Sequence, residues 1–190
     1  MDVIERLLKS QQLFRDTNMS RLLFFIFIFF AKVYYVSAAS AVGSLCFVDE
    51  AVVFSCSSAD GKIISLCSSP TLTASDGYLQ YRYGVKGKIP ELVYPKMPEH
   101  PKENFLSGTV PYSGGGASYL KFSKGKYIYT VFTGIGKGWE KEGVVVKKSG
   151  KQIAHTPCDG SLISELGPVL FEDIGLQKDP LESDFEVPLK

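Results

Sequence analysis

The stretch from Tyr112 to Gly138, YSGGGASYLKFSKGKYIYTVFTGIGKG, carries the strongest β-sheet signal in the chain. It opens on residues 113–118, a loop too rich in glycine to be helical. Large or aromatic side chains then alternate with polar ones over residues 119–123, and β-branched and aromatic residues dominate residues 127–133. Both patterns favour strands, and the polar turn between them predicts a β-hairpin.

Two glycine-containing loops flank this predicted hairpin. The first offers Ser113 and Tyr119, and the second carries Lys137 between Gly136 and Gly138. Because a hairpin starts and finishes at the same end of a sheet, we expect the two loops to lie side by side. Such an arrangement would present a hydroxyl group and an ammonium group together to a partner.

Short strands are expected along most of the remaining chain. Asp60-Gly61 between two apolar runs is a strong hairpin signal, and prolines on both sides of residues 91–94 favour an edge strand. The closely spaced strands predict an all-β fold, a single antiparallel β-sandwich or small β-barrel of about eight short strands. Besides the hairpin above, the expected strands are residues 51–56, 62–67, 78–83, 91–94, 143–147 and 151–155.

The β domain is expected to span residues 42–176 and to include less regular segments. Residues 95–111 contain four prolines and few apolar side chains, which predicts a long irregular connection. Residues 160–166 and 170–176 are expected to form short helical turns near the C-terminus. The last segment, residues 177–190, is expected to be a flexible tail.

The N-terminal region has the pattern of a secretory signal peptide. An unbroken apolar run, residues 22–30, follows a basic start and precedes small residues at 37–41 that suit a cleavage site. If translation starts at Met19, the signal peptide is residues 19–41, and residues 1–18 are an extension outside the true protein. An uncleaved anchor is the alternative. Cleavage would leave no stable membrane insertion and a periplasmic or secreted protein.

Four cysteines follow the expected cleavage region: Cys46, Cys56, Cys67 and Cys158. An even number of cysteines in an exported chain predicts disulfides, and three pairings are possible. Neither C-x-x-C spacing nor a neighbouring histidine supports a metal site, so we predict no metal and no cofactor.

Charge is distributed unevenly, although the formal net charge is only +1. Residues 121–151 hold eight lysines, whereas the segment from Asp159 onward is mainly acidic. The two regions form either an ordinary solvated surface or a basic face for an acidic partner. Nucleic acid is not expected as a partner, because the chain is nearly neutral and has a single arginine after the signal.

No catalytic motif emerges from the sequence, and we predict that the protein is not an enzyme. No serine lies in a G-x-S-x-G motif, and residues 134–138 lack the spacing of a phosphate-binding loop. Glu140 and Glu142 would share one strand face among lysines, where solvated carboxylates are common. A hydrolase that uses Glu140 or Asp159 with His155 is the least favoured alternative.

The motifs between Ser113 and Gly138 resemble those of the bacterial periplasmic lysozyme inhibitors. Inhibitors of chicken-type lysozymes carry an S-G-x-x-Y loop and then a Y-x-x-x-T-K-G-like loop, and a comparable first loop recurs in inhibitors of invertebrate-type lysozymes. Here Ser113-Gly114 is followed by Tyr119 with two extra intervening residues, and Lys137-Gly138 closes the strand that contains Tyr127. Ser123-Lys124-Gly125 is a second candidate for the lysine motif.

The resemblance implies that the two loops enter the active-site cleft of a lysozyme. An envelope protein that binds or supports other components without catalysis is the alternative function. The lysozyme class and the oligomeric state stay open at this point. The residues implied in partner binding are Ser113, Gly114, Tyr119 and Lys137, with Tyr112 and Lys124.

Overall fold

A computed structural model describes residues 43–188 of the 190-residue chain. The predicted extension 1–18 and signal peptide 19–41 lie outside the described residues. Residues 42–190 form a compact unit of their own. Within the described range, no helix has both the length and the apolar character needed to span a membrane.

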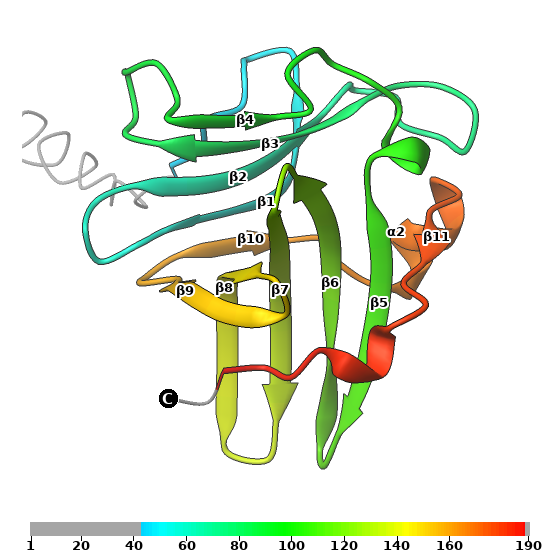
Figure 1. The fold of residues 1–190 in the computed structure, drawn as a ribbon. Helices are drawn as coiled ribbons and strands as arrows, with labels where there is room; N and C mark the ends of the chain where they lie inside the picture. Colours follow the sequence, from blue (N-terminus) through cyan, green and yellow to red (C-terminus); the bar gives the residue numbers. More distant parts are fainter. Residues whose placement is uncertain (1–42, 189–190) are drawn as a thin grey trace, which may run out of the picture. The chain divides into compact units, whose positions relative to one another are not determined.

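Eleven strands of the described residues form two sheets that face each other, which confirms the predicted β-sandwich (Figure 1). The five-stranded sheet has the order β10-β1-β2-β3-β4 and the six-stranded sheet the order β11-β5-β6-β7-β8-β9. All pairs are antiparallel except β11 with β5. The strands are β1 (Ala51–Ser57), β2 (Ile63–Ser68), β3 (Leu79–Gly84), β4 (Leu92–Tyr94), β5 (Leu106–Tyr112), β6 (Gly115–Lys124), β7 (Tyr127–Gly136), β8 (Trp139–Lys148), β9 (Lys151–Pro157), β10 (Leu162–Ser164) and β11 (Gln177–Lys178).

The main core lies between the two sheets, because side chains alternate in direction along each strand. Phe54 and Leu66 come from the five-stranded sheet, and Leu120, Phe122 and Val131 come from the six-stranded sheet. All five are at most 2% exposed. Their burial supplies the hydrophobic stabilisation that holds the sandwich together.

A second, smaller core lies on the other face of the six-stranded sheet and corrects the expectation of a flexible tail. Phe185 and Val187 are each 5% exposed and pack with Tyr119 and Phe132 of that face. The tail crosses the strands there, as the red segment of Figure 1 shows. Without it, those aromatic side chains would face water, so the tail is part of the fold.

Two further expectations were wrong. The proline-containing connection 95–111 includes β5, because Leu106–Tyr112 pairs along its whole length with β6. Residues 160–166 form no helical turn, since β10 pairs with Phe54–Cys56 of β1. A helical turn was correctly expected near residues 170–176, where helix α2 (Pro168–Asp173) lies. Two short 3-10 helices, η1 (Pro101–Glu103) and η2 (Glu182–Asp184), complete the structure.

Both disulfides are formed, and the structure selects one of the three possible pairings. Cys46 is bonded to Cys67 on β2, and Cys56 on β1 is bonded to Cys158, which follows β9. The second bond therefore ties the five-stranded sheet to the end of the six-stranded sheet. Paired cysteines place the protein in an oxidising, extracytoplasmic environment.

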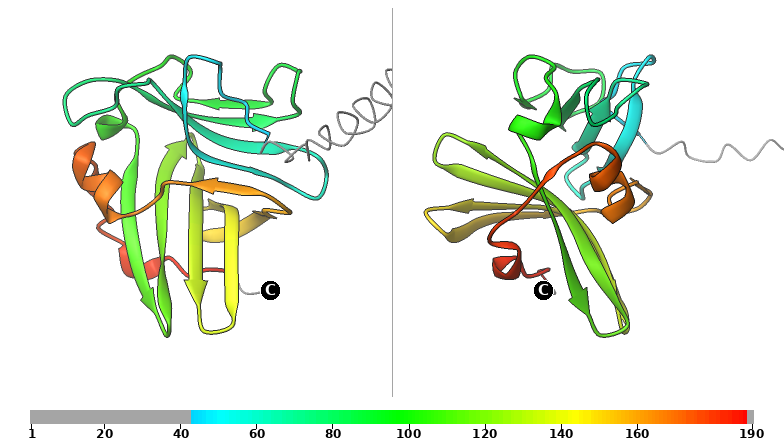
Figure 2. Two further views of the ribbon diagram at one scale, coloured as in Figure 1. Left: turned by 180° about the vertical axis from the view of Figure 1, so that it is seen from behind. Right: turned by 90° about the vertical axis from the view of Figure 1, so that its right-hand side faces the viewer.

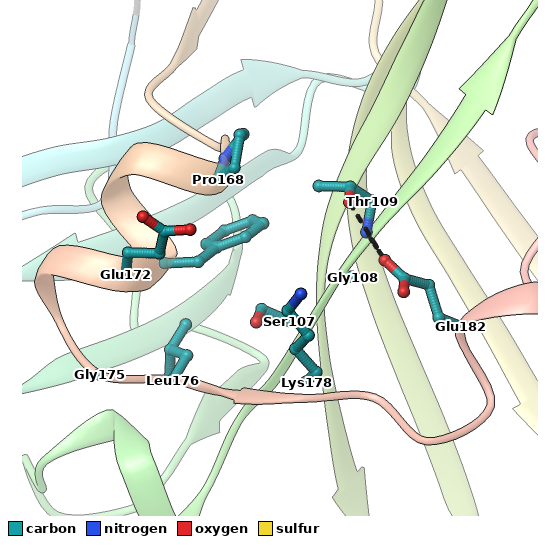
Figure 3. A pocket seen from close by; sticks show the side chains of 10 residues that line it. Ser107, Gly108, Thr109, Pro168, Glu172, Gly175, Leu176, Lys178 and Glu182 are labelled. Atoms are coloured by element: carbon teal, nitrogen blue, oxygen red, sulfur yellow. Dashed lines mark hydrogen bonds between the residues drawn. The ribbon is translucent and has the colours of Figure 1, made fainter.

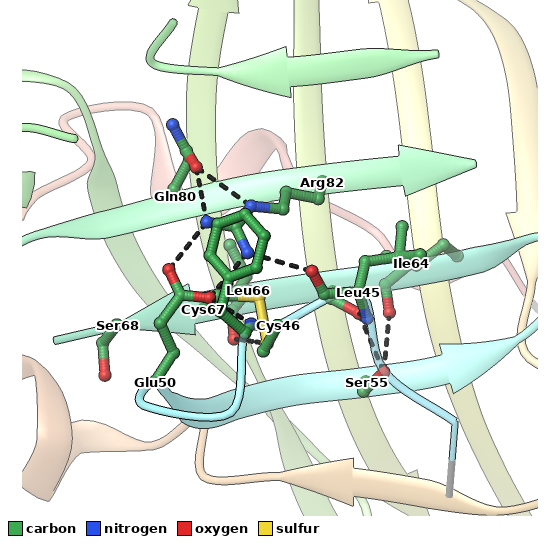
Figure 4. The surroundings of a disulfide bond; sticks show 12 residues. Leu45, Cys46, Glu50, Ser55, Ile64, Leu66, Cys67, Ser68, Gln80 and Arg82 are labelled. Carbon is green, nitrogen blue, oxygen red and sulfur yellow. Dashed lines mark hydrogen bonds and ion pairs between the residues drawn. A yellow bond between two sulfur atoms is a disulfide. The ribbon is translucent and has the colours of Figure 1, made fainter. Parts of the chain in front are cut away.

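The segment 43–50 lies across the outer face of the five-stranded sheet and is held there by a buried ion pair (Figure 4). The Arg82 guanidinium donates to both carboxylate oxygens of Glu50, each at 2.6 Å. The side chains of Arg82 and Glu50 are 4% and 1% exposed. The same guanidinium donates to the Leu45 carbonyl and to Gln80, so the segment is fixed by polar contacts as well as by the Cys46–Cys67 bond.

Candidate functional site

The β5–β6 and β7–β8 turns lie side by side at one end of the six-stranded sheet (Figure 1). We call Ser113, Gly114, Lys137 and Gly138 the double tip. The Lys137 backbone N–H donates to the Ser113 carbonyl at 2.8 Å, which joins the two turns directly. All four residues are exposed. The expected juxtaposition of the two loops is therefore present in the structure.

The backbone of the double tip requires glycine at its first turn. Gly114 has φ of 80°, in the left-handed region that side chains disfavour. A Cβ atom at this position would also lie 3.1 Å from the Lys137 nitrogen. A larger residue would therefore strain the turn and crowd the hydrogen bond between Ser113 and Lys137.

Two aromatic side chains pack against each other in the strands next to the double tip. Tyr112 at the end of β5 meets Trp139 at the start of β8 edge to face, with ring centroids 5.2 Å apart. The Tyr112 hydroxyl also accepts a hydrogen bond from the Val187 N–H at 2.9 Å. Tyr112 is half-buried, so it positions the tip and the tail while part of its side chain stays open to solvent.

Replacing Tyr112 with phenylalanine is expected to lower the free energy of unfolding by about 1–2 kcal/mol, since the Val187 N–H loses its partner. The conformation of the double tip should stay unchanged, because the ring contact with Trp139 remains. Urea unfolding would measure the loss. Tyr127→Phe is the matched control, as its hydroxyl makes no hydrogen bond within residues 43–188. Equal loss in both variants would contradict this role for Tyr112.

Tyr119 is buried, so it does not lie on the exposed surface where it was predicted to bind a partner. Its side chain is 0% exposed, and its hydroxyl donates to the Asp179 carboxylate at 2.8 Å. Burial and the Asp179 charge raise the pKa of Tyr119. The reason is that the turn has only two residues, Ser113 and Gly114, so Tyr119 lies well inside β6.

Lys124 is also separated from the other site residues. It is the last residue of β6, at the opposite end of these strands from the double tip, where it pairs with Tyr127 of β7. Of the two candidate lysine motifs, only Lys137-Gly138 adjoins Ser113. Ser123 and Lys124 at the end of β6 and Gly125 in the following turn are nevertheless exposed and of similar chemistry, which makes them a matched control for experiments at the double tip.

The residues of the alternative hydrolase do not form an oriented catalytic pair. His155 Nε2 is buried without a hydrogen-bond partner in the described part of the chain. Burial and the nearby Lys141 lower the pKa of His155. Burial and Glu140 raise the pKa of Glu142. Neither carboxylate Glu140 nor Asp159 makes a hydrogen bond with the histidine within residues 43–188.

One cluster has metal-binding atom types, Cys46, Glu50 and Cys67, with ligand atoms within 4.8 Å of one another. Both sulfur atoms are already bonded to each other, and the carboxylate is paired with Arg82. The cluster is therefore a structural element.

A pocket of about 310 Å³ lies between β5, helix α2 and the C-terminal segment (Figure 3). Sequence reasoning missed it, because its walls come from residues far apart in the chain. Glu182 at its edge is already used: its carboxylate accepts from the N–H and hydroxyl of Thr109. Glu172 and Lys178 are the other charged groups that line it. Among the described residues that line it, there is no histidine or cysteine beside these charged groups.

Comparison with known proteins identified no relative. No protein-family model matches the chain, and no curated protein or solved structure matches it.

Proposed function

We propose that the protein is an exported inhibitor of lysozyme that inserts the double tip into the active-site cleft. The observation that carries the proposal is the 2.8 Å hydrogen bond between the Lys137 N–H and the Ser113 carbonyl, because it places both exposed side chains on adjoining turns. The two disulfides agree with a periplasmic or secreted location.

The chemistry of the tip suits the cleft of a glycosidase. Lysozyme cleaves its substrate with two carboxyl groups, one acting as an acid and one as an anion. The Ser113 hydroxyl can donate to one carboxyl group and accept from the other when that group is protonated. The Lys137 ammonium can make charge-assisted hydrogen bonds to the anion. An inhibitor of this kind offers no bond that the enzyme can cleave.

The structural support of the tip also suits inhibition. The tip continues four paired strands, β5 to β8, and rests on Tyr112 and Trp139. A preformed protrusion loses little conformational entropy when it binds. Ile135, which is 54% exposed close to the tip, provides an apolar contact for the cleft wall. Lysozyme binding therefore requires no rearrangement of the sandwich.

The test is inhibition of chicken-, goose- and invertebrate-type lysozymes by the purified protein in a cell-wall clearing assay. We expect stoichiometric inhibition of at least one class. Ser113→Ala/Lys137→Ala should weaken that inhibition by about 100-fold, since two central contacts are lost. Ser123→Ala/Lys124→Ala removes the same chemical groups from the opposite end of the strands and should inhibit like the wild type.

Two results would contradict the proposal. One is the absence of inhibition of all three classes at micromolar protein, which would favour an envelope protein that binds another component. The other is an equal loss of inhibition in both double variants, which would show that lysine charge, and not the geometry of the double tip, governs binding.

A further inference from the structure

Exposed apolar side chains gather around the outer face of the five-stranded sheet. Phe47 and Val48 are 67% and 107% exposed, Ile89 in the β3–β4 connection is 91% exposed, and Met97 after β4 is 65% exposed. They are four of the nine large hydrophobic residues that are exposed among residues 43–188. Phe47 lies over the Arg82 guanidinium, with 4.3 Å between the ring centroid and Cζ, but most of its surface, like that of the other three side chains, is open to contact something outside the chain.

A groove of about 580 Å³ lies among the segments that carry these side chains. Phe47 lines the groove, and Ile89 and Met97 each lie between two residues that line it. The segment 43–50, the β3–β4 connection and the loop after β4 form its walls. Each wall thus contains an exposed apolar residue.

Three lysines lie on the same walls: Lys86, Lys88 and Lys96 line the groove and are exposed. None of them forms an ion pair in the part of the chain that the structure describes. Of the acidic groups nearby, Glu91 is paired with Lys62, and Asp49 is exposed. The rim therefore combines free positive charge with projecting apolar groups.

The floor of the groove leaves no charge free for a small ligand (Figure 4). The Arg82 guanidinium donates to Glu50, Gln80 and the Leu45 carbonyl, which together use all three of its nitrogen atoms. The Glu50 carboxylate also accepts from Tyr78 and from the Phe47 N–H. The charged side chains that remain available to a partner at this groove thus lie on its rim. This arrangement suits contact with an extended surface better than binding of a small ligand.

We propose that this rim docks on a membrane surface that contains anionic lipids. Lysines beside an anionic bilayer gain electrostatic energy, while adjoining apolar side chains enter the interface. Charge complementarity favours this occupant, because the three lysines of the rim have no acidic partner among the described residues and adjoin exposed apolar residues.

The orientation that follows leaves the double tip free. In Figures 1 and 2 the segment 43–50 and the β3–β4 connection lie at the top of the ribbon, and the β5–β6 and β7–β8 turns lie at the bottom. A protein docked by the rim would point these turns away from the bilayer. The docking proposal does not depend on lysozyme inhibition and is tested without lysozyme.

The test uses residues 42–190, which form a compact unit, so that the apolar run cannot itself bind lipid. We expect the protein to sediment with vesicles of three parts phosphatidylcholine to one part phosphatidylglycerol, but not with pure phosphatidylcholine. Lys86→Ala/Lys88→Ala/Lys96→Ala should weaken binding by about 100-fold. Lys124→Ala/Lys126→Ala/Lys151→Ala changes the net charge equally, away from the groove, and should weaken it far less.

The apolar contribution is tested by Ile89→Ser/Met97→Ser, which should weaken vesicle binding by about 10-fold, whereas the exposed pair Ile153→Ser/Val169→Ser should bind like the wild type. The chain has a single tryptophan, Trp139, which begins β8 beside the β7–β8 turn. Brominated lipids should therefore leave wild-type fluorescence unchanged and quench the tryptophan introduced by Phe47→Trp.

Several outcomes would overturn the proposal. They are the absence of binding to anionic vesicles, equal losses in the two lysine variants, and quenching of Trp139 in the wild type. Absence of vesicle binding would instead assign the rim to a protein partner, because the exposed apolar groups would still need an occupant.

Discussion

The double variant Cys56→Ala/Cys158→Ala is expected to lose about 5 kcal/mol of folding free energy. The two cysteines are 102 residues apart, so their bond removes a large amount of conformational entropy from the unfolded chain. The bond also connects β1 to the end of β9, and thus one sheet to the other. A loss of this size is a large fraction of the stability of a typical domain.

The matched control is Cys46→Ala/Cys67→Ala, which opens a loop of 21 residues and should cost about 3 kcal/mol on the same loop-entropy argument. Guanidinium unfolding at equilibrium, with both double variants and the wild type, measures the difference. If opening the shorter loop proves the more damaging, loop entropy is not the main contribution of these bonds. The contacts of segment 43–50 would then be the dominant factor.

The sequence was most informative where strands alternate and turns contain glycine. The hairpin at Asp60-Gly61 and the edge strand between Pro90 and Pro95 were correctly predicted, as β1, β2 and β4 show. The same local signals placed Ser113 and Lys137 at one end of the sheet. These features are determined by residues close together in the sequence, so they could be predicted without knowing which distant segments pack against them.

Strand β5 was missed because proline usually interrupts a sheet. Pro111 is tolerated because β5 pairs fully with β6 on one side, whereas on the other side β11 reaches only Leu106 and Ser107. The Pro111 nitrogen points to that open side, where no ladder hydrogen bond is lost. Whether a proline is tolerated in a strand depends on whether a neighbouring strand lies on the side of its nitrogen. The number of prolines in a segment does not show this.

The tail was misjudged for a related reason. Residues 177–190 contain Phe185 and Val187 without any helical or strand period, so they indicate disorder when read alone. Their partners, Tyr119 and Phe132, lie more than fifty residues earlier. The same error affected Tyr119, which was assigned to a surface because the apolar cover that buries it was not recognised.

Glu50→Ala is expected to lower the free energy of unfolding by about 3–5 kcal/mol, since it leaves the Arg82 charge buried without its partner. Glu50→Gln keeps the shape but removes the charge and should lose somewhat less. Glu91→Ala is the matched control. It removes the partner of Lys62 at 2.9 Å on the surface, where water screens the charges, and it should leave the unfolding midpoint nearly unchanged.

The pH dependence of stability distinguishes the contribution of the Glu50–Arg82 ion pair from the contribution of Glu50 to packing. Burial alone would raise the pKa of Glu50, but the hydrogen bonds from Arg82, the Phe47 N–H and Tyr78 outweigh it and lower the pKa below the ordinary value of 4.5. The unfolded chain therefore takes up the proton first as the pH falls. The contribution of Glu50 is complete above pH 4.5 and is lost as the pH falls through the folded-state pKa.

Unfolding measured from neutral to acidic pH should thus converge for the wild type and Glu50→Gln, because acid neutralises the wild-type carboxylate. A constant difference between the two proteins at every pH would show that the Glu50 charge does not stabilise the fold. Convergence would show that this charge holds segment 43–50 on the sheet. Phe47 and Val48 belong to that segment. Glu50→Gln should therefore also weaken binding to anionic vesicles at neutral pH, which links the Glu50–Arg82 ion pair to the proposed membrane contact.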